Sequence, residues 1–308
     1  MGTSTKKTEI IHDDPSHPLA STIKIMITRI KKNTRTRLPG GVTRRRWFRK
    51  ALLLPSEHGS WSWLLVPYMV GATISRQWSL ASLLVLLGGL SVFLVRQPAT
   101  AWLRIRQGRG RRSDEPIAMV WTISLLLLGG VSLLGLLSLR RLALLWLLPP
   151  VVALLVMYLT VAQLHRARVR SAGMEIAGAI GLAVMAPAAY AAGSGQLDAT
   201  AWLIWLLMAL QNVLGVFYVR LRIADTHDRD ERRLPLVVAH VAGLLLAALC
   251  LAVYSQLWLA LLPFVFYLAR AIWLTLSKRP VPDMKRFGFT EVGVELISGL
   301  WLVVISRL

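Results

Sequence analysis

The feature that most constrains this chain is a series of long apolar blocks separated by short charged segments. Nine blocks can be traced, at residues 57–75, 78–95, 117–138, 142–164, 171–192, 199–219, 235–254, 257–276 and 289–306. A helix needs about 20 apolar residues to cross a bilayer. In lipid the backbone must satisfy its own hydrogen bonds, which a helix does. The blocks therefore predict an all-α bundle of nine transmembrane helices.

The charges are distributed as in a membrane protein. A formal net charge of +21 would suggest nucleic-acid binding if it were gathered on a soluble face. Instead, the loops on the same side as the N-terminus hold 18 Lys and Arg residues, and the opposite loops hold Arg76, Arg140 and Arg141. This bias predicts a plasma (inner) membrane protein with a cytoplasmic N-terminus. We therefore expect no nucleic-acid partner.

The chain divides into two segments by composition. Residues 1–50 hold 13 Lys and Arg residues against three acidic ones, and we expect a basic cytoplasmic tail that is largely disordered. Residues 51–308 hold all the apolar blocks and form the membrane domain. The block at 171–192 is rich in Ala and Gly, which lets helices approach closely in lipid. This span is therefore expected in the middle of the bundle.

Glu57 and His58 stand at the mouth of the first span. Ser56 can cap the N-terminus of this helix, and Glu57 would then lie in its first turn, where the helix dipole favours a carboxylate. Alternatively, both side chains line a cytoplasm-facing cavity, in which His58 donates to an anion or carries a proton. The second interpretation makes Glu57 and His58 candidate catalytic residues.

Arg96 and Arg104 follow the second apolar block. Arginines at this place can simply anchor the cytoplasmic side of the span. Alternatively, they bind an anionic headgroup such as a diphosphate, which suits the guanidinium fork. The second interpretation makes both arginines candidate substrate-binding residues.

A run of acidic residues follows the sixth block. Asp225, Asp228 and Asp230 are spaced so that their carboxylates could converge on Mg²⁺, which usually takes one or two carboxylates plus substrate phosphates. Asp225 and Asp228 are therefore the candidate metal ligands. The alternative is a solvated loop helix with ion pairs four residues apart, from Asp225 to Arg229 and from Asp228 to Arg232.

Several polar residues lie inside apolar blocks. Gln211 and Asn212 favour either a polar interior that binds substrate or hydrogen bonds between helices. Glu295 lies one turn deeper than Glu291 and on the same face, so it is an intramembrane carboxylate that needs an explanation. Arg270 could pair with Glu295 or extend its charge toward water. Gln211, Asn212 and Glu295 are candidate substrate-binding residues, as is Arg222 after the sixth block.

Three short motifs resemble one family of bacterial membrane proteins, the YwiC-like family. The first is Glu57-His58-Gly59-Ser60-Trp61, followed by Leu64-Leu65-Val66-Pro67. The others are Arg96-Gln97-Pro98 and Tyr218-Val219-Arg220-Leu221-Arg222. This resemblance runs from about residue 54 to the end of the chain. It implies an integral membrane protein and carries no established activity.

A weaker similarity is to the UbiA superfamily of intramembrane prenyltransferases, which have nine spans and two acidic motifs in cytoplasmic loops. Asp225 and Asp228 stand where the second motif would be, and the first is replaced by Arg96-Gln97-Pro98-Ala99-Thr100-Ala101-Trp102. The similarity implies Mg²⁺ on the two aspartates and an isoprenoid diphosphate held by Arg96. It implies further that Tyr218, with Glu57 and His58, orients the acceptor.

Three functions remain open at this point. The first is binding of a polyprenyl diphosphate or another anionic membrane lipid in a cytoplasm-facing cavity. If the protein is an enzyme, this function includes transfer of the prenyl chain to an acceptor. The second is a proton-coupled transporter or permease that uses Glu175, His240 and Glu295. The third is a non-catalytic membrane assembly component. Asp225→Ala should remove metal-dependent lipid binding under the first, and Glu295→Gln should remove substrate or proton movement under the second.

Overall fold

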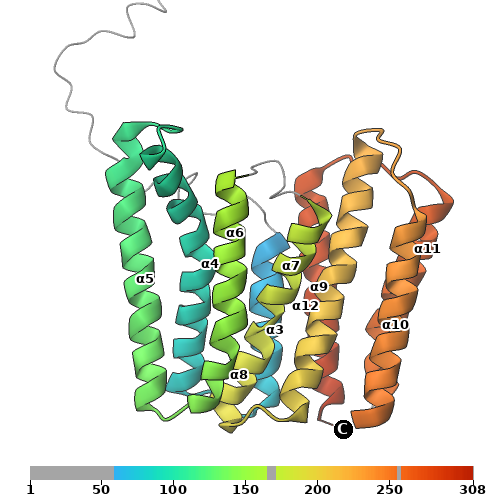
Figure 1. Cartoon of the computed structure of the whole chain (residues 1–308). Coiled ribbons are helices and arrows are strands. Elements are labelled where there is room, and N and C mark those ends of the chain that lie inside the picture. The colour runs from blue at the N-terminus through green and yellow to red at the C-terminus, as the bar shows by residue number, and fades with distance from the viewer. Residues whose placement is uncertain (1–58, 165–170, 255–257, 308) are drawn as a thin grey trace, which may run out of the picture. The chain divides into compact units, whose positions relative to one another are not determined.

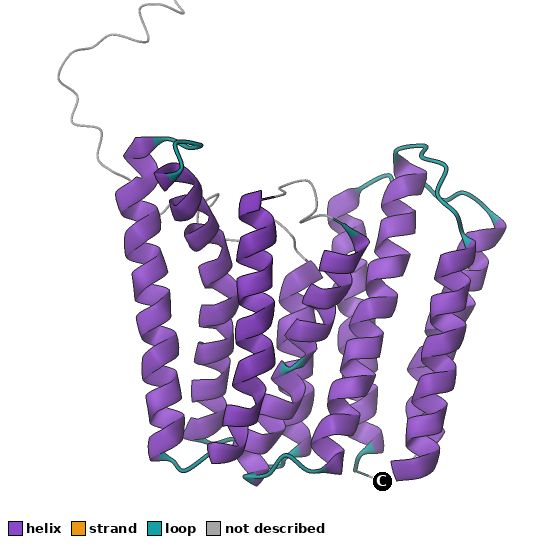
Figure 2. Cartoon of the chain, in the orientation of Figure 1, coloured by secondary structure: helices purple, strands orange, loops and turns teal. Residues whose placement is uncertain are grey.

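The computed structural model describes residues 59–164, 171–254 and 258–307, and the structural statements below concern these residues. They form helices and connecting loops without a strand, packed side by side with alternating direction (Figure 1, Figure 2). The predicted tail at 1–50 and the candidates Glu57 and His58 lie outside the described residues. The helices in chain order are α3 (Gly59–Ile74), α4 (Leu80–Arg106), α5 (Glu115–Ser138), α6 (Leu148–Leu164), α7 (Ala172–Ala183), α8 (Met185–Ser194), α9 (Ala199–Thr226), α10 (Leu234–Tyr254), α11 (Leu262–Leu276) and α12 (Met284–Ile305).

Eight helical segments of the described chain are long and apolar enough to cross a membrane. They correspond to eight of the nine expected spans, with α7 and α8 together forming one of them. The expected first span corresponds to α3, of which 16 residues are described. Large apolar side chains such as Leu126, Val131 and Leu134 are about 60% exposed on α5, where a bilayer would cover them. The all-α membrane fold is confirmed, and the chain is a multi-pass membrane protein.

The charged loops gather at one end of the bundle. The loops at 107–114, 227–233 and 277–283 lie at the upper end of the helices in Figure 1, and the C-terminus lies at the lower end. We call the upper end the basic end, because these three loops carry Arg109, Arg111, Arg112, Arg229, Arg232, Arg233, Lys278 and Arg279. It is the end at which α9 and α11 finish and α12 begins.

The small-residue span lies at the centre of the packing, as expected. The segment α7–α8 packs against α3, α4, α6 and α9. Its alanines at 179, 183, 186, 189, 191 and 192 are almost completely buried. A Cβ on Gly71 of α3 would lie 2.0 Å from the backbone oxygen of Ala186, so glycine is required for the close approach of α3 to α8.

One expected helix is divided in two. The chain breaks at Val184, between α7 and α8. Pro187 has no N–H and cannot donate to the carbonyl of Ala183, four residues earlier. The loss of this hydrogen bond explains why a single apolar block forms two shorter helices with a bend inside the membrane.

Candidate ligand-binding site at the basic end

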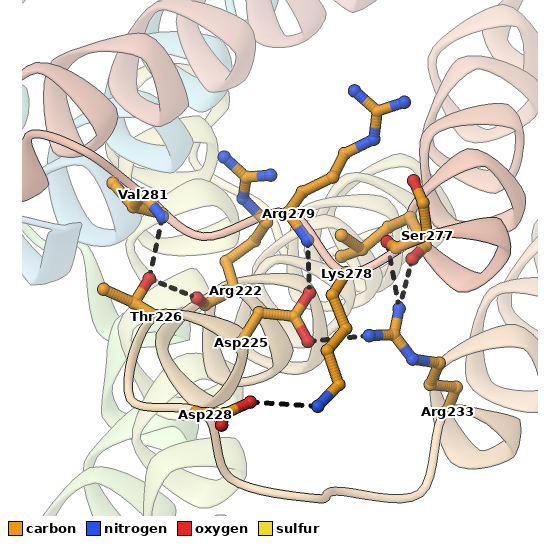
Figure 3. A network of polar contacts seen from close by, with 10 residues as sticks. Arg222, Asp225, Thr226, Asp228, Arg233, Ser277, Lys278, Arg279 and Val281 are labelled. Atoms are coloured by element: carbon orange, nitrogen blue, oxygen red, sulfur yellow. Dashed lines mark hydrogen bonds and ion pairs between the residues drawn. The ribbon is translucent and has the colours of Figure 1, made fainter.

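Asp225 is the centre of a polar network at the basic end (Figure 3). Its side chain is 2% exposed, and both carboxylate oxygens accept hydrogen bonds. Arg233 Nη2 donates to Oδ1 at 2.7 Å, and the backbone N–H of Arg279 donates to Oδ2 at 3.0 Å. One carboxylate therefore joins the end of α9 to the start of α10 and to the loop before α12.

Further bonds hold the same loops. The second guanidinium nitrogen of Arg233 donates to the backbone oxygens of Leu274 and Ser277, at the end of α11. The hydroxyl of Thr226 donates to the backbone oxygen of Arg222 at 2.8 Å and accepts from the N–H of Val281, also at 2.8 Å. These contacts fix the positions of the loops at 227–233 and 277–283.

The ion pairs expected four residues apart are wrong. Asp225 pairs with Arg233, and Asp228 pairs with Lys278 at 3.0 Å. The reason is that α9 ends at Thr226, so residues 227–233 do not continue a helix. Asp228 has a φ of +49°, a left-handed conformation that Asp tolerates better than most residues. Its hydrogen bond and charge raise the pKa of the exposed Lys278 ammonium group, which therefore stays charged at neutral pH.

An aromatic and cationic cluster lies beside this network. The ring of Tyr218 lies 6.4 Å from that of Phe287, centroid to centroid. The Arg270 guanidinium lies over the Tyr218 ring at 4.0 Å and pairs with Glu291 at 2.6 Å. Arg222 lies over the Phe287 ring at 5.3 Å. The structure thus brings together two predicted residues, Tyr218 and Arg222, on α9, with partners from α11 and α12. The proposed Arg270–Glu295 pair is wrong, because Arg270 uses Glu291.

Two arginines of this region have no carboxylate partner among the described residues. Arg222 and Arg279 stack on Phe287 and Trp273, with 3.6 Å between the Arg279 guanidinium carbon and the Trp273 ring centroid. The Nε atom of each is buried without a hydrogen-bond partner in the described structure. Figure 3 shows both guanidinium groups extending to the same side of the view, away from Asp225.

Two guanidinium groups of the site take no part in its ion pairs. The carboxylates of Asp225, Asp228 and Glu291 are each engaged by one cation, respectively Arg233, Lys278 and Arg270. Arg222 and Arg279 remain as positive charge beyond these three pairs. Partly buried guanidinium groups that stack on aromatic rings are preorganised to bind phosphate or carboxylate.

The other substrate-binding candidates on α9 and α12 lie deeper in the bundle. The Asn212 amide nitrogen donates to the backbone oxygens of Trp63 at 3.2 Å and Ala179 at 3.0 Å. Pro67 cannot donate to the Trp63 carbonyl within α3, so Asn212 satisfies a group that the proline leaves free. The Gln211 amide nitrogen donates to the backbone oxygen of Glu295 at 3.1 Å. Both amide nitrogens therefore connect helices.

The candidates on α4 lie elsewhere. Arg96 stacks on Phe93 at 4.6 Å and on Tyr158 at 5.6 Å, between α4 and α6. Arg104 lies in the last turn of α4. This helix packs mainly on α5, α6 and α8, whereas the Asp225 network is built from α9 to α12. No contact described in the structure links Arg96 or Arg104 to that network.

The metal assignment of Asp225 and Asp228 stays a prediction. The described residues contain no group of three or more His, Cys, Asp or Glu side chains close enough to hold a metal ion. Each of the two aspartates has a cationic partner in the structure. A magnesium ion that used them would have to replace these ion pairs.

A cleft lies between α3 and α12. It encloses about 380 Å³ and is lined mainly by apolar side chains, among them Trp61, Val66, Phe289 and Leu296. Its polar lining comes from Ser62 and from Lys285 in the first turn of α12. Such a cleft suits an alkyl or isoprenoid chain, with Lys285 placed toward the basic end.

Sequence reasoning did not find Arg233, Arg279, Trp273 or Phe287 as parts of this site. They lie in loops or at helix ends: Arg233 is beyond the end of α9, and the other three lie far in the sequence from Asp225 and Arg222. The sequence shows a high density of arginine in the loops on the N-terminal side, but positive-inside anchoring explains it equally well. Only the folded loops show which arginines meet carboxylates and which do not.

Residues 54–190 match the family model described as YwiC-like protein. The match covers less than half of the chain, from the residues before α3 to α8. It confirms the resemblance seen in the motif beginning at Glu57, whereas the Asp225 network lies beyond it. No curated protein and no solved structure matches the chain. The similarity to intramembrane prenyltransferases stays a prediction.

Proposed function

Because this chain is an integral membrane protein with a YwiC-like segment, we propose that it binds an anionic amphiphile, an isoprenoid or lipid phosphate, at its basic end. The phosphate group binds Arg222 and Arg279, and the chain lies in the cleft between α3 and α12. The observation that carries the proposal is the pair of stacked arginines without carboxylate partners in the described structure. Phosphate oxygens are the groups that a guanidinium fork binds best.

The orientation of the protein follows from the same charges. The excess of Lys and Arg at the basic end supports a cytoplasmic position for it, in the inner (plasma) membrane. The ligand would then enter from the cytoplasmic leaflet. Acidic lipids of that leaflet add a favourable electrostatic term near these loops.

The binding test uses a reporter that the structure provides. Trp273 lies 3.6 Å from the Arg279 guanidinium, so a phosphate bound to Arg279 should change tryptophan fluorescence. The full-length protein in detergent is titrated with geranylgeranyl diphosphate, in EDTA and in magnesium. We expect saturable binding in both conditions, because the arginines need no metal. Trp273→Phe should remove most of the signal while radiolabelled ligand still binds.

Arg222→Gln and Arg279→Gln should each raise the dissociation constant about tenfold or more. A charge-assisted hydrogen bond contributes about 1.5–3 kcal/mol, and about 1.4 kcal/mol corresponds to tenfold in affinity. Arg232→Gln is the matched control, since it removes the same charge from an exposed position of a neighbouring loop. An equal loss in the Arg232 variant would show that only the overall charge matters.

The metal alternative gives a different result in the same titration. Binding that appears only with magnesium and disappears in Asp228→Asn would support the acidic metal site and contradict the arginine site. Asp228→Asn suits this test because the Asp228 side chain is 89% exposed, so loss of its charge should leave the fold intact. Absence of saturable binding in every condition would reject the proposed function.

A further inference from the structure

A second polar site lies inside the membrane span, around Glu295 of α12. The residue is 7% exposed, and its Oε1 atom is buried without a hydrogen-bond partner in the described structure. Gln211 is 4% exposed, and its Oε1 atom is also buried without a partner there. Ionised carboxylate and amide oxygens only accept hydrogen bonds, so each of these two buried oxygens lacks a donor.

The cations of the neighbourhood do not supply this donor. Arg270 of α11 pairs with Glu291, one turn from Glu295 toward the basic end. Lys285 lies at the start of α12, more than two turns away. The titratable or charged groups of this region on α9, α11 and α12 are Tyr218, Tyr267, Arg270 and Glu291, with Lys285 farther along α12.

The hydroxyl of Ser62 does not supply it either. Ser62 of α3 lies near the Glu295 carboxyl group. Its single hydroxyl hydrogen is donated to the backbone oxygen of Gly59 at 2.8 Å. The Ser62 oxygen can therefore only accept from Glu295. Likewise, the hydroxyl of Tyr267 donates to Ser298 at 2.8 Å.

We propose that Glu295 binds an exchangeable proton inside the membrane span. The proton turns the carboxyl group into a hydrogen-bond donor, for which the nearby Ser62 oxygen is an acceptor. An ionised carboxylate without a cation in an apolar interior would be strongly unfavourable, and a neutral carboxylic acid removes this cost. Ser62 also lines the cleft between α3 and α12, together with Val292 and Leu296 on either side of Glu295, so the proton exchanges through this cleft.

A carbodiimide tests the protonated state directly. N,N′-dicyclohexylcarbodiimide is apolar and reacts with a carboxylic acid, whose O–H adds across a C=N bond; the acyl group then moves to nitrogen as a stable acylurea. Full-length protein in detergent is treated and its intact mass measured. Wild type should gain one adduct more than Glu295→Gln. This difference should fall several-fold at alkaline pH, once the carboxyl group ionises.

Two matched variants test the identity of the site and its route. Glu175→Gln should keep the adduct, because the Glu175 carboxylate is paired with Arg220 and is not the reacting group. Gly288 lines the cleft and has open space where a Cβ would lie, so Gly288→Leu narrows the cleft without a backbone clash. It should slow labelling of Glu295 several-fold.

A stability measurement keeps the proposal falsifiable if labelling is blocked for another reason. Glutamine has the shape of a neutral glutamic acid, so Glu295→Gln should leave the midpoint of thermal unfolding within about 2 °C of wild type near pH 7. A large fall in the midpoint would show that the ionised form is the one the fold uses. Such a fall would overturn the proposal. The proposal would also be overturned by equal adducts in wild type and Glu295→Gln, or by labelling that does not depend on pH.

Discussion

Replacing Asp225 with alanine is expected to lower the free energy of unfolding by about 3 kcal/mol or more. Breaking a buried ion pair by removing one partner typically costs about 3–5 kcal/mol, since the remaining charge is left without compensation. Here the remaining group is Arg233, whose side chain is 23% exposed. The backbone N–H of Arg279 loses its acceptor in the same variant.

Thermal or denaturant unfolding in detergent measures the effect, and Asp228→Asn is the control. The Asp228 carboxylate also belongs to an ion pair, but it is 89% exposed and its partner Lys278 is 54% exposed. Exposed pairs contribute about 0–1 kcal/mol, and Asn tolerates the left-handed backbone of residue 228 as Asp does, so Asp228→Asn should be close to wild type. If the two variants were equally stable, the structural role of Asp225 would be refuted.

This prediction also changes how a binding assay on Asp225 should be interpreted. Loss of ligand binding in Asp225→Ala would follow from displaced loops as readily as from a lost metal ligand. The stability of the variant and its magnesium dependence must therefore be measured together. A variant that is destabilised equally with and without magnesium supports the ion-pair role.

The second large effect is expected at Gly71, where α3 crosses α8. A Cβ at this position would lie 2.0 Å from the backbone oxygen of Ala186 and 2.8 Å from its carbonyl carbon. Backbone atoms cannot rotate away as a side chain can, so the two helices must separate. Overpacking of a core typically costs about 1–3 kcal/mol, and we expect Gly71→Ala to lie at or above the upper limit.

Gly130→Ala is the matched control in a second span. Nothing lies within 4 Å of a Cβ built on Gly130, so the added methyl group enters open space. Alanine is favoured over glycine in a helix by up to about 1 kcal/mol, so this variant should be neutral or slightly stabilised. The melting midpoints of the two variants in detergent make the comparison. Equal midpoints would mean that α3 and α8 do not approach as closely as described.

The sequence by itself determined the fold class and the positions of the helices. Nine apolar blocks of membrane-spanning length admit few structures other than a helical bundle, because lipid leaves no water to satisfy an open backbone. The small-residue block was correctly expected at the centre, since only small side chains permit close approach. The concentration of positive charge at one end was also expected, because every second loop lies on the same side of the membrane and these loops carry most of the Lys and Arg residues. These inferences depend only on the order and spacing of residue types, which can be read from the sequence.

Only the tertiary structure decided which charges meet. The i,i+4 rule failed at Asp225 because α9 ends one residue later and the loop brings Arg233 to it. The sequence offered Glu295 as a possible partner of Arg270, but the structure pairs Arg270 with Glu291, because the choice depends on how α11 and α12 are rotated about their axes. An ion pair weakens as its two groups separate, so a few ångströms decide between Glu291 and Glu295. The spacing of residues along the sequence does not determine these distances. The packing of helices that are distant in the sequence determines them.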